Sequence, residues 1–179
     1  LLWRRRRLLR RQKLAEFYDF IRGKDIVICG NSPEFDELFK KIKLTDNSVV
    51  VRFNRAINHY PRSSTDVYVY GRGMEYTQTD IHKLEKEYKF VIGNYELLLE
   101  NNHIKDNIKL ETPTTGFDFL TCMLTKQHLV KSITILGFNM GSSKSHGFDN
   151  DSMYYKHDRI EEPIQLKRLV DKYNVRYIR

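Results

Sequence analysis

The sequence has little of what marks several common classes of protein. Only two cysteines occur in 179 residues, Cys29 and Cys122, and both lie inside apolar runs. We therefore expect buried free thiols in a reducing compartment, with no catalytic or metal-binding role and no zinc site. No stretch approaches the ~20 apolar residues of a membrane-spanning helix. The chain also lacks Gly-x-Gly-x-x-Gly, Walker A and Gly-x-Ser-x-Gly sequences, so none of these motifs locates a site.

The length of 179 residues and the 12% of aromatic residues favour one domain with a well-filled core. Because the chain begins at Leu1 and not at Met, we expect that a segment upstream has been removed. We expect the protein in the cytoplasm, with peripheral contact to the inner face of the membrane.

Acidic residues are missing from residues 1–13, which hold seven of the 31 basic residues. The remaining 24 basic residues nearly balance the 23 acidic ones, at a net charge of +1, so the basicity belongs to this segment. This basic segment is either the solvated face of a helix or linker, or a peripheral contact with an anionic membrane. The membrane contact is favoured by the apolar residues among the arginines, namely Leu1, Leu2, Trp3, Leu8 and Leu9. Nucleic-acid binding is the less favoured interpretation of this segment, because no stripe of basic and aromatic residues continues into the domain. We divide the chain into a basic amphipathic helix or linker, 1–22, and a domain, 23–179.

Apolar runs of strand length alternate with segments of helical periodicity along the domain. The expected strands cover residues 26–29, 49–53, 67–70, 90–92, 132–138 and 175–178. The expected helices cover residues 1–21, a segment that starts at 32–34, and residues 79–88, 116–129 and 161–173. This alternation predicts an α/β fold, with a Rossmann-like, mostly parallel sheet and helices on both faces.

Small and polar residues follow the first two strands. Gly30-Asn31-Ser32 ends the first run, and Asn54 ends the second. Ligands of open α/β sheets bind just outside the carboxyl ends of the strands. Two amides there can hold a phosphate or a base without adding charge, so we expect a nucleotide-like ligand.

Hydroxyl residues precede the predicted helix that starts near Phe117. The segment Thr112-Pro113-Thr114-Thr115-Gly116 can form an anion site, because free N–H groups and the helix dipole favour negative charge there. The alternative is an ordinary helix cap with a turn.

The segment after the strand 132–138 is rich in glycine, serine and titratable residues. His146 and His157 suit acid–base chemistry near neutral pH, and Glu162 can orient an imidazole. Each histidine taken alone also fits an exposed loop. Asp149-Asn150-Asp151 has the Asp-x-Asp form that holds Mg²⁺ or Mn²⁺ in many glycosyltransferases, but such a polar triplet is common in loops.

In order and spacing, these segments resemble the four sialylmotifs of the eukaryotic-type sialyltransferase family. Residues 26–54 resemble the long motif through Gly-Asn-Ser and the later Arg-x-Asn, and residues 113–138 resemble the short motif. His146-Gly-Phe-Asp149 resembles motif III, and His157 with Glu162 resembles the very short motif, His-x4-Glu. The four motifs cover most of residues 25–162. Campylobacter-type enzymes share the start of the pattern, and some relatives use Kdo.

The resemblance implies an enzyme that transfers sialic acid or Kdo from a CMP-activated donor to a glycan hydroxyl, with inversion and without metal or cofactor. Asn31 and Asn54 then hold the CMP phosphate and cytidine, while His146 lies by the leaving phosphate and His157 is the general base. Thr114, Thr115 and Gly116 contact ribose, phosphate or the sugar carboxylate. The rest of the implied site comprises Gly30, Ser32 and Gly137 as donor-binding residues, with Tyr154 and Glu162 in support.

Several positions depart from the family pattern. Cys29 directly precedes Gly30 and does not occupy the place of the family's disulfide, which fits a microbial intracellular enzyme. Thr114 replaces a serine, and Gly147 replaces an aromatic residue. Two alternatives stay open: a metal-dependent transferase that uses nucleotide-diphosphosugars, and a non-catalytic nucleotide-binding module.

Overall fold

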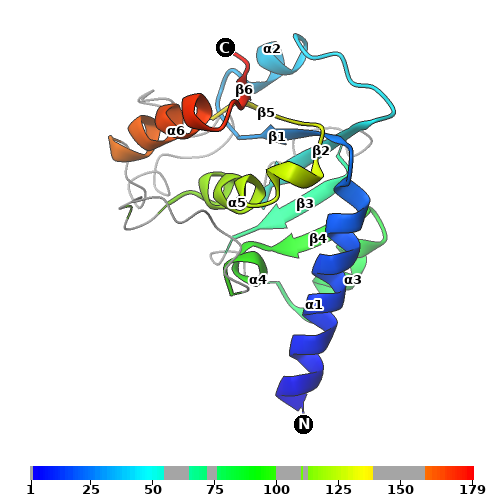
Figure 1. Ribbon diagram of the computed structural model, residues 1–179. Helices are drawn as coiled ribbons and strands as arrows, with labels where there is room; N and C mark the ends of the chain where they lie inside the picture. Colours follow the sequence, from blue (N-terminus) through cyan, green and yellow to red (C-terminus); the bar gives the residue numbers. More distant parts are fainter. Residues whose placement is uncertain (1, 55–64, 72–75, 100–109, 111–112, 139–159) are drawn as a thin grey trace.

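A six-stranded sheet, in which every strand runs parallel to its neighbours, forms the centre of the computed structural model (Figure 1). The structure describes residues 2–54, 65–71, 76–99, 110, 113–138 and 160–179. The strands are β1 (Asp25–Cys29), β2 (Ser48–Phe53), β3 (Val67–Tyr70), β4 (Phe90–Gly93), β5 (Ser132–Leu136) and β6 (Arg176–Tyr177), and their order is β4-β3-β2-β1-β5-β6.

The central strands are apolar along nearly their whole length because helices cover both faces of the sheet. In β1, Ile26 and Ile28 lie in the larger core on one face, whereas Val27 and Cys29 lie in a smaller core on the other. Strand β1 pairs with β2 on one side and with β5 on the other, with Ile26 beside both Val49 and Ile133. The predicted α/β fold is confirmed.

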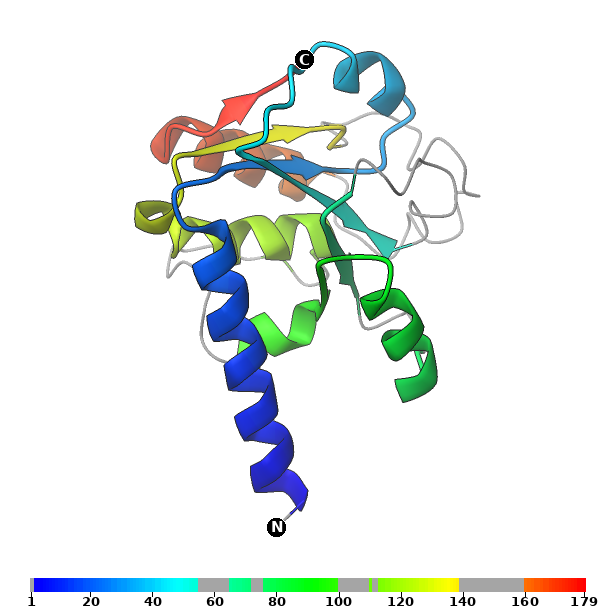
Figure 2. The same ribbon diagram turned by 90° about the vertical axis from the view of Figure 1, so that its right-hand side faces the viewer.

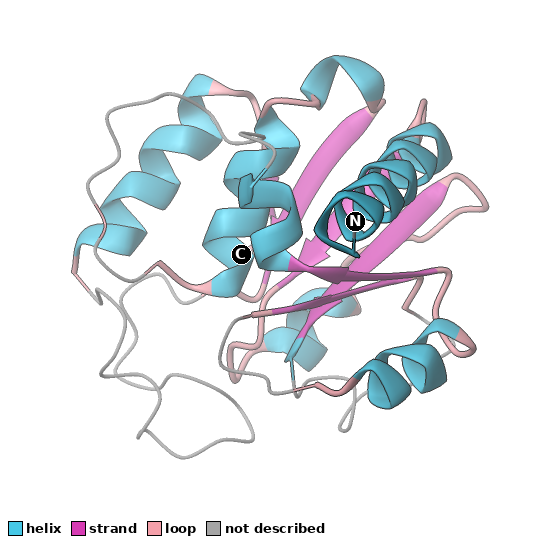
Figure 3. Cartoon of the chain, turned by 90° about the horizontal axis from the view of Figure 1, so that it is seen from below, coloured by secondary structure: helices cyan, strands magenta, loops and turns pink. Residues whose placement is uncertain are grey.

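Helices lie on both sides of the strands when the molecule is viewed from below (Figure 3). The larger core is covered by α1 (Leu2–Ile21), α4 (Asn94–Leu99), α5 (Thr115–Leu124) and α6 (Glu161–Lys172). The opposite face packs against α2 (Phe35–Phe39) and α3 (Gln78–Glu85). A short 3₁₀ helix (Gln127–Leu129) precedes β5.

Helix α1 has two halves that differ in burial. Leu14, Phe17 and Ile21 are buried in the larger core, and Gly23, with φ of 71°, ends the helix. The predicted boundary between residues 22 and 23 therefore lies at the end of α1. The second half of this helix, however, packs in the core of the domain. At the middle of α1, Lys13 Nζ lies 3.6 Å from Glu85 Oε1 of α3. None of the described helices is long and apolar enough to cross a membrane.

Helix α5 and strand β5 end earlier than the sequence predicted, and local backbone features accompany both ends. The helix expected over 116–129 ends at Leu124, and the Thr125 hydroxyl donates a hydrogen bond to the carbonyl of Cys122. Strand β5 ends at Leu136 because Gly137, with φ of 67°, leaves the extended conformation. Helix α4 was not expected, since it follows β4 with no intervening turn residue.

Phe17 tests whether the second half of α1 belongs to the folded domain. Its side chain is 1% exposed, and its ring meets that of Phe90 edge-on at 5.5 Å between centroids. We expect Phe17→Ala to lower the free energy of unfolding by about 3–5 kcal/mol, because it leaves a cavity in the core. The exposed Glu16→Ala on the same helix is the control. Equal urea-unfolding midpoints for the two variants would contradict this packing.

Candidate functional site

The strand order creates a switch point between β1 and β5. From β1 the chain builds β2, β3 and β4 on one side, and it then returns to place β5 and β6 on the other side. The loops that leave β1 and β5 therefore diverge from adjacent strand ends. In open α/β sheets such a point, at the carboxyl ends of the strands, is where ligands bind.

Two glycines allow the ends of β1 and β5 to meet. A Cβ atom on Gly30 would lie 2.4 Å from the carbonyl oxygen of Gly137, and a Cβ atom on Gly137 would lie 2.9 Å from the carbonyl oxygen of Gly30. The Ser32 N–H donates to the Gly137 carbonyl at 2.8 Å, and the Gly30 N–H donates to Leu136 at 2.9 Å. These contacts hold the loop after β1 directly against the end of β5.

Asn31 and Ser32 carry buried polar atoms at this point. Asn31 Nδ2 donates to the carbonyl of Phe53 at 3.2 Å, which ties the loop to the end of β2. The remaining amide oxygen of Asn31 and the hydroxyl of Ser32 are buried and have no hydrogen-bond partner among the described residues. A buried polar atom without a partner costs free energy, so these two atoms are suited to a ligand.

Asn54 links three elements at the end of β2. It adopts φ of 50°, a conformation that Asn tolerates better than most residues. Its Oδ1 accepts the N–H of Gly71 at 2.8 Å, and its Nδ2 lies 3.4 Å from Thr115 Oγ1. The amide of Asn54 therefore joins the end of β3 to the start of α5, which leaves it less available to a ligand than the amide of Asn31.

The start of α5 confirms the helix cap predicted for the segment 112–116, and the anion site there stays a prediction. Thr114 is the N-cap residue, because its hydroxyl accepts the N–H of Phe117 at 3.2 Å. The first N–H groups of a helix lack intrahelical partners, and the helix dipole makes them attractive to anions. Gly116 is buried, and a Cβ atom there would approach the ring of Phe138 at 3.1 Å. Thr115, Gly116 and the end of β5 are thus neighbours.

Glu162 holds the start of α6 against the start of α5. Its Oε1 accepts the Thr114 hydroxyl at 2.6 Å, and its Oε2 accepts the Thr114 N–H at 2.8 Å. Glu162 is 9% exposed, so both charge-assisted bonds are largely shielded from water. Glu162 is thereby a positioning residue for the cap of α5.

Burial keeps both cysteines in the thiol form. It raises the pKa of the Cys29 thiol to about 12, against a smaller opposing effect of the nearby Arg52 guanidinium. It raises the pKa of Cys122 to about 12 as well. Neither forms a disulfide, so the predicted buried free thiols are confirmed.

The predicted site residues His146, Tyr154 and His157 lie outside the described residues, and so does Asp149-Asn150-Asp151, the metal site of the alternative interpretation. Their roles stay predictions. Among the residues that the structure describes, no group of three His, Cys, Asp or Glu side chains is placed to hold a metal ion.

Three site features escaped the sequence analysis. Gly71 lies against Thr115, since a Cβ atom there would be 2.4 Å from its hydroxyl. Arg52 is 2% exposed, and its guanidinium stacks 3.7 Å from the ring centre of Phe35. Asn94 follows β4 and donates to Asp118 of α5 at 3.2 Å. Gly71 had a signal, because a glycine directly follows the apolar run 67–70, and Arg52 is the arginine of the Arg-x-Asn pattern, although its contact with Phe35 was not predicted.

The described part of the edge offers a defined set of chemical groups. At the carboxyl ends of the strands, the amide oxygens of Asn31 and Asn94 and the hydroxyl of Ser32 are buried without a hydrogen-bond partner among the described residues. The N-terminus of α5 and two glycines that expose backbone at the switch point complete the set. These groups can bind, side by side, a neutral ligand group that donates hydrogen bonds and an anionic group that accepts them.

Glu162 tests the link between α5 and α6. We expect Glu162→Ala to lower the free energy of unfolding by about 1–3 kcal/mol, because the Thr114 N–H loses a charged acceptor in a buried place. Glu161→Ala removes the same charge from the same helical turn and should cost less. In a double-mutant cycle, Thr114→Ala combined with Glu162→Ala should cost less than the sum of the two. Additive effects in urea unfolding would show that the two residues do not interact.

The chain matches no protein-family model, and no curated protein sequence matches it significantly.

Proposed function

We propose that this chain is a glycosyltransferase that moves sialic acid or a related 2-keto acid sugar (Kdo) from a CMP-activated donor to a hydroxyl of a glycan acceptor. The observation that carries the proposal is the meeting of three motif segments at the switch point. The loop 30–32, Asn54 and the helix start 114–116 are far apart in the sequence, yet hydrogen bonds and backbone contacts join them to the end of β5 or to each other. These are the segments that resemble the long and short sialylmotifs.

The amide of Asn31 favours a cytidine nucleotide. Its nitrogen is already bound to the Phe53 carbonyl, which fixes the orientation of the amide and leaves an oxygen that can only accept. A phosphate at neutral pH offers no donor, whereas the amino group of cytosine and the hydroxyls of ribose do. Uracil has a carbonyl where cytosine has its amino group, so an acceptor facing that edge discriminates against uridine nucleotides.

Hydrogen-bond donors for the phosphate of the CMP-sugar are present in the same loop and at the start of α5. The Ser32 hydroxyl is buried without a partner among the described residues, and it can donate to a phosphate oxygen. At the start of α5, Thr115 and Gly116 add N–H groups and the positive end of a helix dipole, beside the Thr114 N–H that the Glu162 carboxylate already holds. CMP is a monophosphate leaving group, so its single phosphate fits a site with dipoles in place of a metal.

The transfer itself is assigned to the histidines by the resemblance. The acceptor oxygen attacks the anomeric carbon as the bond from that carbon to the CMP phosphate breaks, and the configuration inverts. His157 takes the proton of the acceptor hydroxyl, and His146 contacts the departing phosphate. Glu162, five residues after His157 in the sequence, binds Thr114 and so holds the start of α6 against the start of α5.

Nucleotide binding tests the proposed donor site. We expect CMP to bind more tightly than UMP, UDP or GDP in calorimetry, and Asn31→Ala to weaken CMP binding by about 1–3 kcal/mol through loss of a buried hydrogen bond. Asn47→Ala is the matched control, because Asn47 Nδ2 also donates to a backbone carbonyl, that of Gly23, next to the amino end of β1. Tighter binding of UDP than of CMP would contradict a CMP-sugar donor.

The role of His157 is tested by turnover with CMP-sialic acid and CMP-Kdo. A positioned general base contributes about 10²–10⁴ in rate, so His157→Ala should lower kcat by this factor and leave CMP affinity nearly intact. His128→Ala, at an exposed residue of the 3₁₀ helix, should have no effect.

Metal dependence separates the proposal from its main alternative. We expect turnover to survive EDTA, whereas a transferase built on Asp149-Asn150-Asp151 would lose its activity. CMP binding without turnover of any donor would instead indicate a non-catalytic nucleotide-binding module.

A further inference from the structure

The first half of α1 extends past the rest of the molecule. Figures 1 and 2, which differ by a quarter turn, both show it running beyond β4, α3 and α4 to a free end. Burial of α1 starts at Leu14, and residues 2–9 are all exposed. Lys13, just before the first buried residue, forms ion pairs with Glu85 of α3 and Glu96 of α4.

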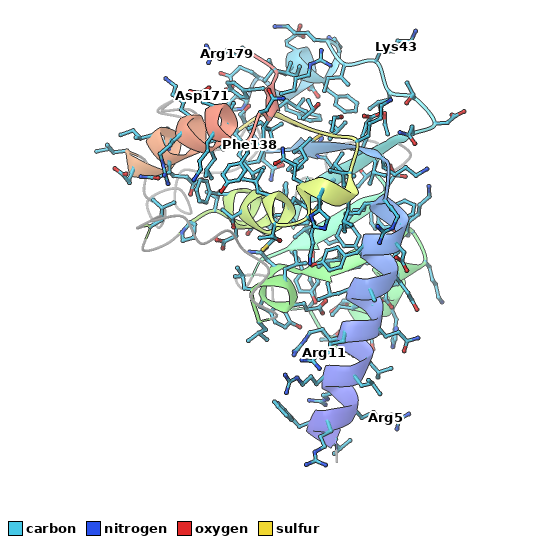
Figure 4. The ribbon with its side chains drawn as sticks, in the orientation of Figure 1. Arg5, Arg11, Lys43, Phe138, Asp171 and Arg179 are labelled. Carbon is cyan, nitrogen blue, oxygen red and sulfur yellow. The ribbon has the colours of Figure 1, made fainter. Side chains whose placement is uncertain are left out.

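Positive charge is concentrated on this half-helix. Residues 4–11 contain six arginines, and residues 2–13 contain no acid. Arg4, Arg5, Arg6 and Arg7 are consecutive, so at about 100° per residue they surround the helix. Figure 4 shows Arg5 near the free end of α1, away from the other elements.

Large apolar side chains are exposed among the arginines. The exposed fractions are 75% for Leu2, 70% for Trp3, 67% for Leu8 and 56% for Leu9. The guanidinium of Arg7 lies 5.6 Å from the ring centre of Trp3, which gives one cation–π pair at the tip. Elsewhere in the described residues, four more large apolar side chains are exposed, and they are spread over residues 44–164.

We propose that residues 2–11 dock the protein on the surface of an anionic lipid bilayer. Arginine heads bind lipid phosphates on all sides of a helix lying at headgroup depth, while Trp3 and the leucines enter the acyl boundary. A nucleic acid would use the arginines but would leave the leucines in water, and the near-neutral remainder of the chain offers it no continuation. In Figure 1 the start of α1 lies at the opposite end of the molecule from β1 and β5, so docking leaves the proposed donor site accessible. The docking proposal does not depend on the proposed function.

Trp3 is the sole tryptophan of the chain and therefore reports this contact directly. The experiment adds the full chain to vesicles of phosphatidylglycerol and phosphatidylethanolamine at low salt, and measures both co-sedimentation and tryptophan fluorescence. We expect binding with a blue shift, no binding to phosphatidylcholine vesicles, and loss of binding at high salt.

Charge variants separate this surface from general basicity. Replacing Arg4, Arg5, Arg6 and Arg7 by Gln should lower partitioning by about a hundredfold, because each arginine near an anionic surface contributes severalfold. The control replaces four exposed basic residues elsewhere by Gln, namely Lys43, Lys86, Lys167 and Arg176. It removes the same charge and should bind within a small factor of the parent. Circular dichroism of each variant verifies folding.

Four outcomes would overturn the proposal. The first is no blue shift with anionic vesicles, and the second is an equal loss of binding in both quadruple variants. The third is tighter binding to DNA or RNA with unchanged Trp3 emission, which would identify a nucleic-acid partner. The fourth is a blue shift without lipid that accompanies dimer formation in sedimentation equilibrium, which would identify a second copy as the occupant.

Discussion

Where β1 and β5 end, the backbones of Gly30 and Gly137 touch, and the rest of the site depends on this close approach. Any side chain at Gly30 would collide with the carbonyl of Gly137, so only two glycines allow the contact. The contact directs the loop after β1 across the end of β5 and lets the Ser32 N–H reach the Gly137 carbonyl. The ends of β1 and β5 are therefore joined by backbone contacts at the switch point of the sheet.

Three polar side chains connect the ends of β1 and β5 to the neighbouring strands and helices. Asn31 reaches β2, Asn54 joins β3 to α5, and Glu162 joins α5 to α6. A neutral bond contributes only about 1 kcal/mol net and the charged bonds of Glu162 somewhat more, but together they set the positions of the strand ends and helix starts before any ligand arrives. Such preorganisation lowers the entropic cost of binding. In the loop after β1, the oxygen of Asn31 and the hydroxyl of Ser32 are buried without a hydrogen-bond partner among the described residues.

The molecule separates its two proposed tasks in space. The carboxyl edge of the sheet holds the amides, hydroxyls and helix start proposed to bind a CMP-sugar, whereas the positive charge lies on the first half of α1. Lys13 lies where the burial of α1 changes, because residues 2–9 are exposed, whereas Leu14, Phe17 and Ile21 on one side of the second half are buried. One helix thus serves as part of the core and as a basic surface, which would keep a transferase close to acceptors at a membrane.

By itself the sequence determined the fold class and the strand ends that carry the site. Apolar runs and helical periodicity are local signals, and so are Gly30, Asn31 and Asn54 at the ends of those runs. Only the tertiary structure decided that Glu162 binds Thr114, 48 residues away, and that Gly71 lies against Thr115, because such contacts depend on strand order. It also decided that half of α1 joins the core, since Trp3 and Phe17 look equally apolar in the sequence, and only the position of the sheet buries one and leaves the other exposed.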